Sequence, residues 1–336
     1  MYHEKFKGSP YEMGFRWGSR LAANGNYILE NIGFPMSMER LRFAAECLPV
    51  YQNYFPEILE EIRGIADGQN CPPEMLHAFL FSMYAMPPAC CCSCFAVSTQ
   101  SQILFGRNSD FLTSLKKTNQ NVIYRFSAGT SFSFTGNTTA FVQMEDGVNE
   151  HGLAAGLASV YPHTIRPGIN AGLLLRFFLE KCRTTEEVLA SVQKLPLSSA
   201  QTFTIADASG SIALVECCGE KVAVSRPGPL PFVCATNLFH TPEMMAYNNL
   251  RTDNWEAKRR FQTMDRFLTA HSPQMDFTDA VRLLSGREGF LCQYDTRTGK
   301  DTVWSVIYDL KKREIFRAEG NPGRKQFRID KRFSFS

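Results

Sequence analysis

The sequence lacks a strong excess of charge of either sign. Its 36 basic and 33 acidic residues leave a formal net charge of +3 at neutral pH. Proteins that bind nucleic acid or an anionic membrane surface through charge need a larger basic excess, so the composition argues against both kinds of partner. The basic stretch GRKQFRIDKRF, residues 323–333, is a local exception that we interpret as a solvated edge.

Long hydrophobic runs are also missing. The most apolar segments, HAFLFSMYAM and AGLLLRFFLE, are shorter than the roughly 20 residues that cross a bilayer. The start, MYHEKFKGSPYEMGF, is polar and has no hydrophobic segment typical of a secretion signal. We therefore expect a cytoplasmic protein without a membrane partner. Its eleven cysteines, an odd number, are then expected to stay reduced, which disfavours a disulfide framework.

Internal repeats and long linkers are absent, and the pattern of secondary structure changes along the chain. The first ninety residues predict helices, beginning with SPYEMGFRWGSRLA, which carries a capping-box signature. From residue 92 on, short β-rich segments alternate with turns. Two predicted helices at 168–182 and 184–195 precede a hairpin, TFTIADASGSIALVE, and more helix and strand follow. This order, without regular βαβ alternation, predicts layers of helix and antiparallel sheet.

Four cysteines stand within five positions: Cys90, Cys91, Cys92 and Cys94. They could be metal ligands, buried core residues, or one nucleophile with neighbours. A metal site usually draws Cys-x-x-Cys pairs from separate segments, and consecutive residues in extended chain point to opposite faces, so three of these thiols cannot face one ion. Burial in a tight core remains open, since free cysteine is among the most buried residue types. A non-enzymatic, thiol-rich metal-binding protein is the alternative from a different class.

A nucleophilic cysteine needs a base. His151 or His240 could form a Cys–His dyad, but neither lies in a recognisable motif. A chain cut just before a cysteine supplies another base, because that residue then carries both a thiol and a free α-amine. The amine has a reference pKa of about 7.7–8.0 and can accept the thiol proton and return it to the leaving group. The junction between the helical and β-rich segments is where such a cut would fall.

The stretch CSCFAVSTQSQILFGRNSDF, residues 92–111, resembles the start of the mature chain in N-terminal-nucleophile hydrolases. That start has the pattern Cys-Thr/Ser-x-Phe-Ala-Val followed by Gly-Arg-Asn-x-Asp-Phe. The chain is most similar to the isopenicillin N acyltransferase branch, with penicillin V acylases and bile salt hydrolases as more distant relatives. The segments GSPYEMGFRWGSRLA, DGVNEHGLAAGL, TFTIADASGSIALVE and CATNLF also fit that branch, so the resemblance covers most of the chain.

The resemblance implies an α+β fold, a four-layer αββα sandwich with an N-terminal helical leader. Residues 1–91 would form this leader, and residues 92–336 would form the body. The precursor would cut itself between Cys91 and Cys92, and the leader would stay bound as the α subunit of one structural unit, with the body as the β subunit. A higher oligomer is compatible with this organisation.

The resemblance also implies roles for individual residues. It assigns the nucleophile to Cys92, with Cys91 as the alternative register. Arg107 would lie beside the thiolate and favour its charged form. Asp110 would hold the new α-ammonium group, and Asn237 would donate its side-chain N–H to the oxyanion of the tetrahedral intermediate.

A further arginine of the family lies downstream of the asparagine motif. The segment WEAKRRF offers Lys258, Arg259 and Arg260, and we expect Arg260 to be the equivalent residue. The chain departs from bile salt hydrolases and penicillin V acylases at Ala158, where those enzymes carry an asparagine. A second oxyanion donor must then come from the backbone or another side chain.

The reaction that the resemblance implies is acyl transfer through a Cys92 acyl-enzyme, with no cofactor and no metal. We expect hydrolysis of a linear amide C–N bond in a small N-acyl substrate, because water needs no second binding site. Transferases and hydrolases share this scaffold, and a fold does not fix a function. Acyl transfer from a thioester donor such as acyl-CoA is therefore the alternative within the class.

Overall fold

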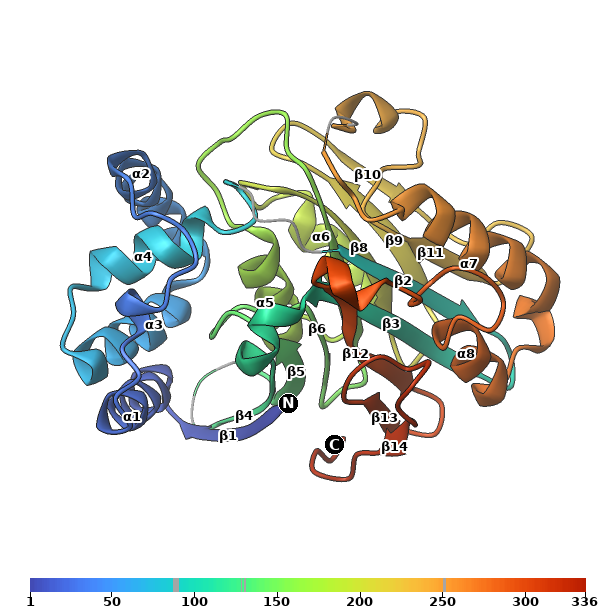
Figure 1. Ribbon diagram of the computed structural model, residues 1–336, viewed down its shortest axis with the longest axis horizontal. Coiled ribbons are helices and arrows are strands. Elements are labelled where there is room, and N and C mark those ends of the chain that lie inside the picture. Colours follow the sequence, from blue (N-terminus) through green and yellow to red (C-terminus); the bar gives the residue numbers. More distant parts are fainter. Residues whose placement is uncertain (87–90, 128, 130, 250–251) are drawn as a thin grey trace.

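Two β-sheets pack face to face and carry helices on their outer faces (Figure 1). This computed structural model describes residues 1–86, 91–127, 129, 131–249 and 252–336; Cys90 thus lies outside the described residues. Apolar side chains from both sheets, such as Phe105, Tyr308, Val148 and Ala154, form the core between them.

The first sheet has eight strands in the order β1-β4-β5-β6-β7-β8-β9-β10. Their bounds are β1 (Tyr2–Gly8), β4 (Gln120–Phe126), β5 (Phe134–Thr138), β6 (Asp146–Asn149), β7 (Ala154–Val160), β8 (Ala200–Ala206), β9 (Ile212–Cys217) and β10 (Val222–Ser225). Strand β1 corrects the expectation of an all-helical leader. It pairs in parallel with β4, more than a hundred residues away, and so joins the leader to the sheet of the body.

The second sheet is antiparallel and has six strands in the order β11-β2-β3-β12-β13-β14. Their bounds are β2 (Cys91–Ser98), β3 (Ile103–Leu112), β11 (Phe232–Ala235), β12 (Lys300–Asp309), β13 (Glu314–Ala318) and β14 (Arg328–Ile329). In the β2–β3 hairpin, Cys91 lies opposite Asp110 and Cys94 opposite Arg107. Because side chains alternate along a strand, Cys92, Cys94 and Arg107 face the first sheet, while Cys91 and Asp110 face the other way.

The leader is built from α1 (Pro10–Ala23), α2 (Met38–Tyr54), α3 (Pro56–Gln69) and α4 (Pro73–Ser82) after strand β1. The predicted capping box is present at Ser9 and Glu12. Helices α1 and α3 approach so closely that a Cβ added to Gly14 would lie 2.1 Å from the backbone oxygen of Glu61. The same holds for Gly64 against Tyr11, at 2.2 Å. The glycines of the leader segment therefore serve close helix packing.

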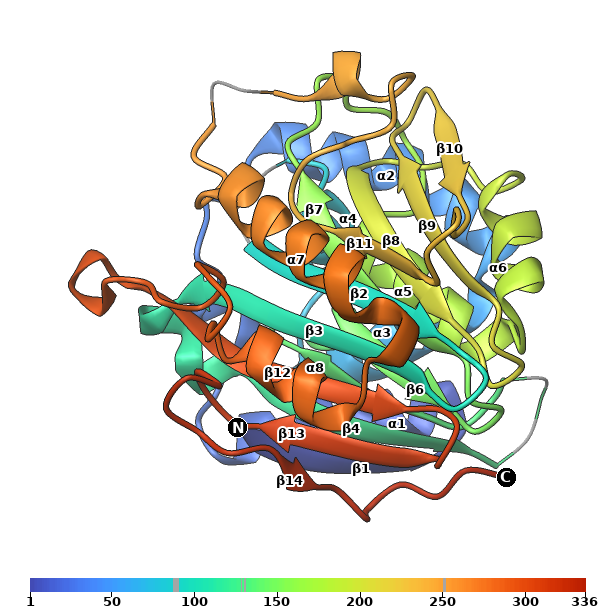
Figure 2. The same ribbon diagram turned by 90° about the vertical axis from the view of Figure 1, so that its right-hand side faces the viewer.

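Four helices belong to the body: α5 (Ala171–Lys181), α6 (Thr185–Val192), α7 (Ala257–His271) and α8 (Phe277–Leu284). Helix α5 packs on the first sheet, with the Phe178 ring 5.3 Å from that of Phe203. Helices α7 and α8 cover the second sheet (Figure 2). This arrangement confirms the predicted four-layer αββα fold. Short 3-10 helices lie at η1 (Ile28–Glu30), η2 (Thr113–Thr118), η3 (Met245–Tyr247), η4 (Ser272–Gln274) and η5 (Thr296–Thr298).

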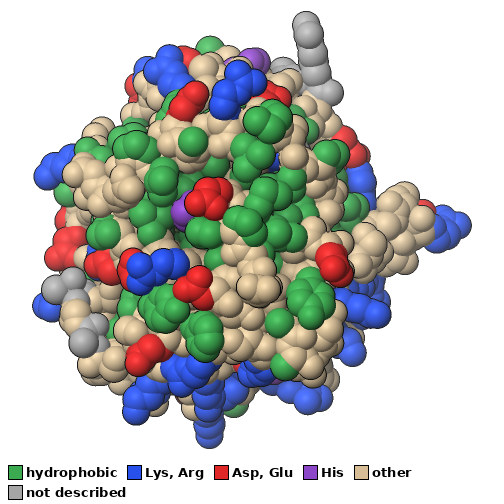
Figure 3. All heavy atoms as spheres, turned by 90° about the vertical axis from the view of Figure 1, so that its left-hand side faces the viewer, with side chains coloured by type: hydrophobic (Ala, Val, Ile, Leu, Met, Phe, Trp, Pro, Cys, Tyr) green, Lys and Arg blue, Asp and Glu red, His purple; other side chains and the backbone are tan. Residues whose placement is uncertain are grey.

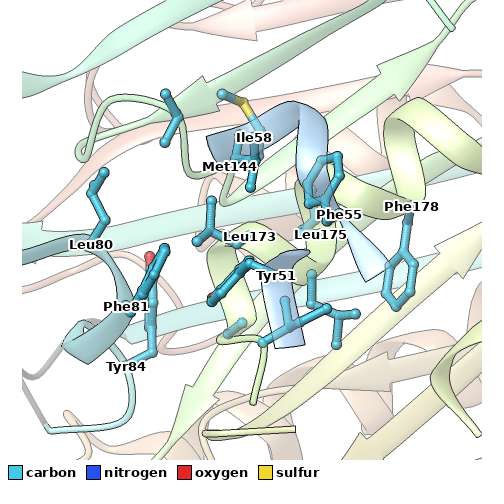
Figure 4. Close-up of a cluster of buried hydrophobic side chains, with 14 of the residues drawn as sticks. Tyr51, Phe55, Ile58, Leu80, Phe81, Tyr84, Met144, Leu173, Leu175 and Phe178 are labelled. Carbon is cyan, nitrogen blue, oxygen red and sulfur yellow. The ribbon is translucent and has the colours of Figure 1, made fainter. Parts of the chain in front are cut away.

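Leader and body share one apolar core. Figure 4 shows Tyr51, Phe55 and Phe81 of the leader beside Leu173 and Phe178 of α5. Hydrophobic side chains also gather on the surface at the leader side of the molecule (Figure 3). In the described part of the chain, no helix has both the length and the apolar character needed to cross a membrane.

Candidate active site

Three of the predicted site residues converge on Cys92, the second residue of β2. The Cys92 N–H donates to Asn237 Oδ1 at 2.8 Å, and the Cys92 carbonyl accepts from Arg260 Nη1 at 2.5 Å. Arg107 Nη2 donates to Cys92 Sγ at 2.7 Å. Cys92 has no exposed surface in this uncut chain. Residues from β3, α7 and the end of β11 therefore hold the backbone and the thiol of one cysteine.

Arg107 lies on β3 and is completely buried between the sheets. Its Nη1 donates to Asp146 at 2.8 Å, and its Nη2 lies 3.4 Å from Glu145. Its Nε donates to the carbonyl of Leu157 at 3.1 Å. Burial alone would lower the pKa of Arg107, but the thiols and carboxylates around it hold that pKa well above its usual range. The side chain is therefore a permanent cation at the Cys92 thiol.

The neighbouring cysteines differ from Cys92 in their surroundings. Cys94 is buried on the same face of β2, beside Arg107, and burial raises the pKa of its thiol to about 12. Such a thiol stays protonated near neutral pH. Cys91 is also buried but lies on the opposite face of the strand, across from Asp110.

Asp110 sits on the outer face of β3, under helix α7. It accepts hydrogen bonds from Tyr294 Oη at 2.9 Å and from Thr302 Oγ1 at 2.5 Å. Arg260 Nη1 lies 3.7 Å from its carboxylate. Burial raises the pKa of Asp110 to about 6, although Arg260, Thr302 and Tyr294 act in the opposite direction. The predicted contact with the Cys92 α-ammonium concerns the cut chain, because that group forms only on cleavage.

Asn237 follows β11 and is oriented by contacts at both ends of its amide. Oδ1 accepts from the Cys92 N–H and, at 2.9 Å, from Arg260 Nη2. Nδ2 donates to the carbonyl of Ser159, at the end of β7, at 2.8 Å. These contacts place the amide nitrogen, the donor in the predicted role, near the end of β7 that also carries Ala158.

Arg260 is the residue of WEAKRRF that reaches this site. It is fully buried, whereas Lys258 and Arg259 are exposed. Its Nη1 also donates to Ser93 Oγ at 2.9 Å, and its Nε donates to the Trp255 carbonyl at 3.0 Å. The structure thus brings Cys92, Arg107, Asp110, Asn237 and Arg260 into one buried network.

Asp146 and Glu145, the two carboxylates at Arg107, were not among the site residues predicted from the sequence. Asp146 opens the segment DGVNEHGLAAGL and begins β6, a strand whose four residues are all buried. A buried carboxylate needs a partner, so the burial of Asp146 would have indicated a charged partner such as Arg107. That signal depends on knowing the burial, which the local sequence does not reveal.

Other chemistries find less support among the described residues. Within those ranges, no group of three or more His, Cys, Asp or Glu side chains is arranged to hold a metal ion. The ten described cysteines are free thiols. The ring of His240 stacks on Phe261 with centroids 3.5 Å apart, and burial lowers its pKa to about 4. His151 packs edge-on against Phe132.

A family model described as acyl-coenzyme A:6-aminopenicillanic acid acyl-transferase matches residues 97–324, which is more than half of the chain. The match begins five residues after Cys92 and does not include the cysteine cluster. It confirms the family resemblance found in the sequence. A search of curated proteins gives no sequence match.

Several solved structures resemble the chain at low identity. Penicillin V acylase from Agrobacterium tumefaciens is 16% identical, with a TM-score of 0.48 over 73% of this chain and 99% of that chain. The Caenorhabditis elegans ortholog of N-acylethanolamine-hydrolyzing acid amidase is also 16% identical, with a TM-score of 0.48 over 65% of this chain and 93% of that chain. A mutant of conjugated bile acid hydrolase from Clostridium perfringens is 16% identical, with a TM-score of 0.45 over 73% of this chain and 98% of that chain. Identities this low say nothing about the substrate of this chain.

Proposed function

Since the chain belongs to the acyl-coenzyme A:6-aminopenicillanic acid acyl-transferase family, we propose that it is a self-cleaving cysteine enzyme that hydrolyses linear amide C–N bonds of small N-acyl substrates. The observation that carries this proposal is the set of contacts at Cys92. Its nitrogen, carbonyl oxygen and sulfur are held by Asn237, Arg260 and Arg107, respectively. An ordinary core cysteine requires no such set of polar partners.

The first proposed reaction is self-cleavage. The Cys92 thiol attacks the carbonyl carbon of Cys91, the peptide C–N bond breaks, and the new α-amine takes the proton as a thioester forms. Water then opens the thioester and leaves a Cys91 carboxylate and a free Cys92 thiol. Arg107 supports the attack because a fixed cation at the sulfur favours the thiolate.

Turnover of substrate uses the same groups with the α-amine as the base. The amine takes the thiol proton, the thiolate attacks the substrate carbonyl, and an oxyanion forms. Asn237 Nδ2 is the proposed donor to this oxyanion, and Asp110, which is buried beside Arg260, is the proposed partner of the α-ammonium. When the tetrahedral intermediate collapses, the C–N bond of the substrate breaks and the Cys92 α-ammonium gives its proton to the leaving amine. Water then hydrolyses the Cys92 acyl-enzyme.

Acyl transfer is the second candidate, and the matched family favours it. In that reaction an acyl thioester such as acyl-CoA acylates Cys92, and an amine rather than water takes the acyl group. No cofactor or metal enters either scheme. Both suit free thiols in a cytoplasmic protein, which is the location we propose.

The leader is proposed to stay bound as an α subunit after cleavage. Its helices share an apolar core with α5, and Glu61 of α3 pairs with Arg176 of α5 at 2.8 Å, both completely or almost completely buried. Release would expose this apolar core to water and break the buried Glu61–Arg176 ion pair, which is costly.

Intact-mass measurement of the purified chain tests the proposal. We expect two chains, residues 1–91 and 92–336, and a single whole chain for Cys92→Ala. Cys91→Ala is the matched control and should still be cut, because it changes the attacked residue and not the thiol. A product that begins at residue 91, or a fully active enzyme that remains whole, would contradict Cys92 as the N-terminal nucleophile.

A further inference from the structure

The carboxylate of Asp146 is saturated by four hydrogen-bond donors. Oδ2 accepts from Arg107 Nη1 at 2.8 Å and from Trp304 Nε1 at 2.9 Å. Oδ1 accepts from Tyr308 Oη at 2.8 Å and from Asn137 Nδ2 at 2.6 Å. An ionised carboxylate has about four acceptor sites, so all of them are filled. Asp146 is completely buried and joins donors from both sheets.

These contacts fix the direction in which Arg107 points. Asp146 holds Nη1, and the carbonyl of Leu157 holds Nε. A guanidinium group is planar and rigid, so two fixed nitrogens determine the position of the third. That third nitrogen, Nη2, is the one that lies on Cys92 Sγ.

Glu145 and the Cys92 thiol compete for the same nitrogen of Arg107, Nη2. Glu145 Oε2 lies 3.4 Å from Arg107 Nη2, the nitrogen that also contacts the Cys92 thiol at 2.7 Å. If Asp146 did not hold Nη1, the attraction of Glu145 would draw the guanidinium away from the sulfur. Glu145 itself stays in place because Ser109 and Thr139 donate to it.

We propose that Asp146 is a positioning residue, which keeps Arg107 Nη2 close to the Cys92 thiol, at 2.7 Å, and prevents it from moving from its longer 3.4 Å contact into a closer pair with Glu145. This inference rests on the proposed function, in which Cys92 is the nucleophile. Asp146 touches neither the thiol nor a substrate; it acts through Arg107. Trp304 and Tyr308 contribute by fixing the carboxylate from β12.

The sign of one effect separates positioning from simple electrostatics. Asp146→Asn removes a negative charge, and charge removal alone would lower the pKa of the Cys92 thiol. The asparagine amide, however, cannot accept from four donors and turns its own N–H groups toward some of them. Arg107 then shifts toward Glu145, the thiol loses its cation, and its pKa rises.

Self-cleavage of newly translated chains provides the readout, because it needs no reagent to reach a buried thiol. Labelled chains are transferred to buffers across a pH series, and the cut fraction is followed by gel and intact mass. For Asp146→Asn we expect the pH midpoint of the cleavage rate to rise by about one unit, which is a loss of about tenfold at a pH below the midpoint. A merely structural role would lower the rate without moving the midpoint.

Matched variants keep the test decisive. Asp207→Asn is the control: Asp207 is a buried carboxylate with several donors of its own, in the β8–β9 turn. It should leave the midpoint in place. Tyr308→Phe removes one donor to Asp146 without changing its charge, and its midpoint should rise by less than that of Asp146→Asn. Asp146→Glu should recover part of the rate.

The outcomes distinguish this inference from the proposed function. If Cys92→Ala is still cut, or the product begins at another residue, the proposed function fails whatever Asp146 does. If cleavage depends on Cys92 but the midpoints of Asp146→Asn and Tyr308→Phe fall or do not move, the positioning role alone is overturned. If Asp146→Asn is uncut at every pH, Tyr308→Phe decides by the direction of its midpoint.

Discussion

Two completely buried arginines, Arg107 and Arg176, have nearly the same carboxylate and carbonyl partners but differ in one remaining neighbour. Each contacts two carboxylates and one backbone carbonyl: Asp146, Glu145 and Leu157 for Arg107; Glu61, Glu180 and Val142 for Arg176. The Arg176 guanidinium also lies 3.8 Å from the centre of the Tyr124 ring, whereas Arg107 donates to the thiol of Cys92.

The difference separates a structural charge cluster from a reactive one. Arg176 lies where the leader meets the body: it pairs with Glu61 of the leader helix α3 and with Glu180 of its own helix α5. Burial acts to lower the pKa of Arg176, but Glu61 and Glu180 raise it above its usual range. Arg107 is equally charged and equally buried, yet one of its nitrogens is directed at a potential nucleophile. Burial and ion pairing alone therefore do not identify an active site.

The largest expected effect comes from replacing each arginine by glutamine. Both changes leave two buried carboxylates without their cationic partner, so both should destabilise the fold by about 3–5 kcal/mol. Only Arg107→Gln should also slow self-cleavage of the folded protein, by about 10- to 1000-fold, because the thiol loses a cation that shifts its pKa by about one to three units. Thermal unfolding and cleavage rates are measured below the lower melting temperature. Equal loss of cleavage in folded Arg176→Gln would contradict the distinction.

A second prediction sharpens the comparison at the oxyanion. Asn237→Ala should reduce turnover by about two to three decades, the usual loss for one oxyanion donor. Asn248→Ala is the matched control, because Asn248 lies in the same connection and bonds only the backbone of Phe239 in its two side-chain contacts. Steady-state kinetics on a panel of N-acyl amides would measure both. Wild-type turnover by Asn237→Ala would remove Asn237 from the proposed site.

Asp110 gives a prediction about stability and pH. Its pKa is raised to about 6 by burial, so the folded state binds this proton more tightly than the unfolded chain does. The resulting stabilisation is complete below pH ~4 and is lost as the pH rises through 6, a change of about 3 kcal/mol. In an uncut Cys92→Ala background, Asp110→Asn should therefore gain stability relative to its parent between pH 4 and 7.

Asp330→Asn serves as the control for that measurement. Burial raises the pKa of Asp330, but Arg332 and Arg317 lower it below its usual range. Its stabilising contribution is therefore already complete above pH ~4 and is lost only at lower pH. Melting temperatures of Asp330→Asn and its parent should differ by a constant amount between pH 5 and 7. An Asp110→Asn difference that is equally flat would show that Asp110 is ionised throughout.

The smallest effect is expected from the histidines. His240 stacks on Phe261 and burial lowers its pKa to about 4, while His151 packs edge-on against Phe132. His240→Gln and His151→Gln should keep turnover within about twofold, the range of substitutions away from critical contacts. Loss of activity in either variant, with normal cleavage, would favour a Cys–His dyad over the α-amine.

Local sequence signals predicted the parts of the fold that depend on neighbours in the chain. The capping box at Ser9 and Glu12 and the hairpin through Asp207 are both present. Strand β1 could not be predicted in this way, because its short, polar sequence is stabilised by pairing with β4, far away in the chain. Its residues alternate in no clear hydrophobic pattern, with Phe6 as the buried member.

The candidate site divides in the same way. The motif at residues 92–111 indicated Cys92, Arg107 and Asp110, and the structure brings them together. Arg260 was the expected residue among three adjacent basic ones, and the direction of α7 places it, and not Arg259, against β2. Asp146 went unnoticed because its importance lies in donors from β3, β5 and β12, which no local pattern connects.

The most direct test of the central claim is to locate the acyl group on the enzyme. The mature protein is incubated with an activated N-acyl substrate, quenched in acid and digested, and the N-terminal peptide of the β chain is sequenced by mass spectrometry. We predict one acyl group on the sulfur of Cys92, with a free α-amine on the same residue, and a smaller acylated fraction in cleaved Arg107→Gln at matched times. An acyl group on Cys91 or Cys94, or turnover without any acylated cysteine, would contradict the account.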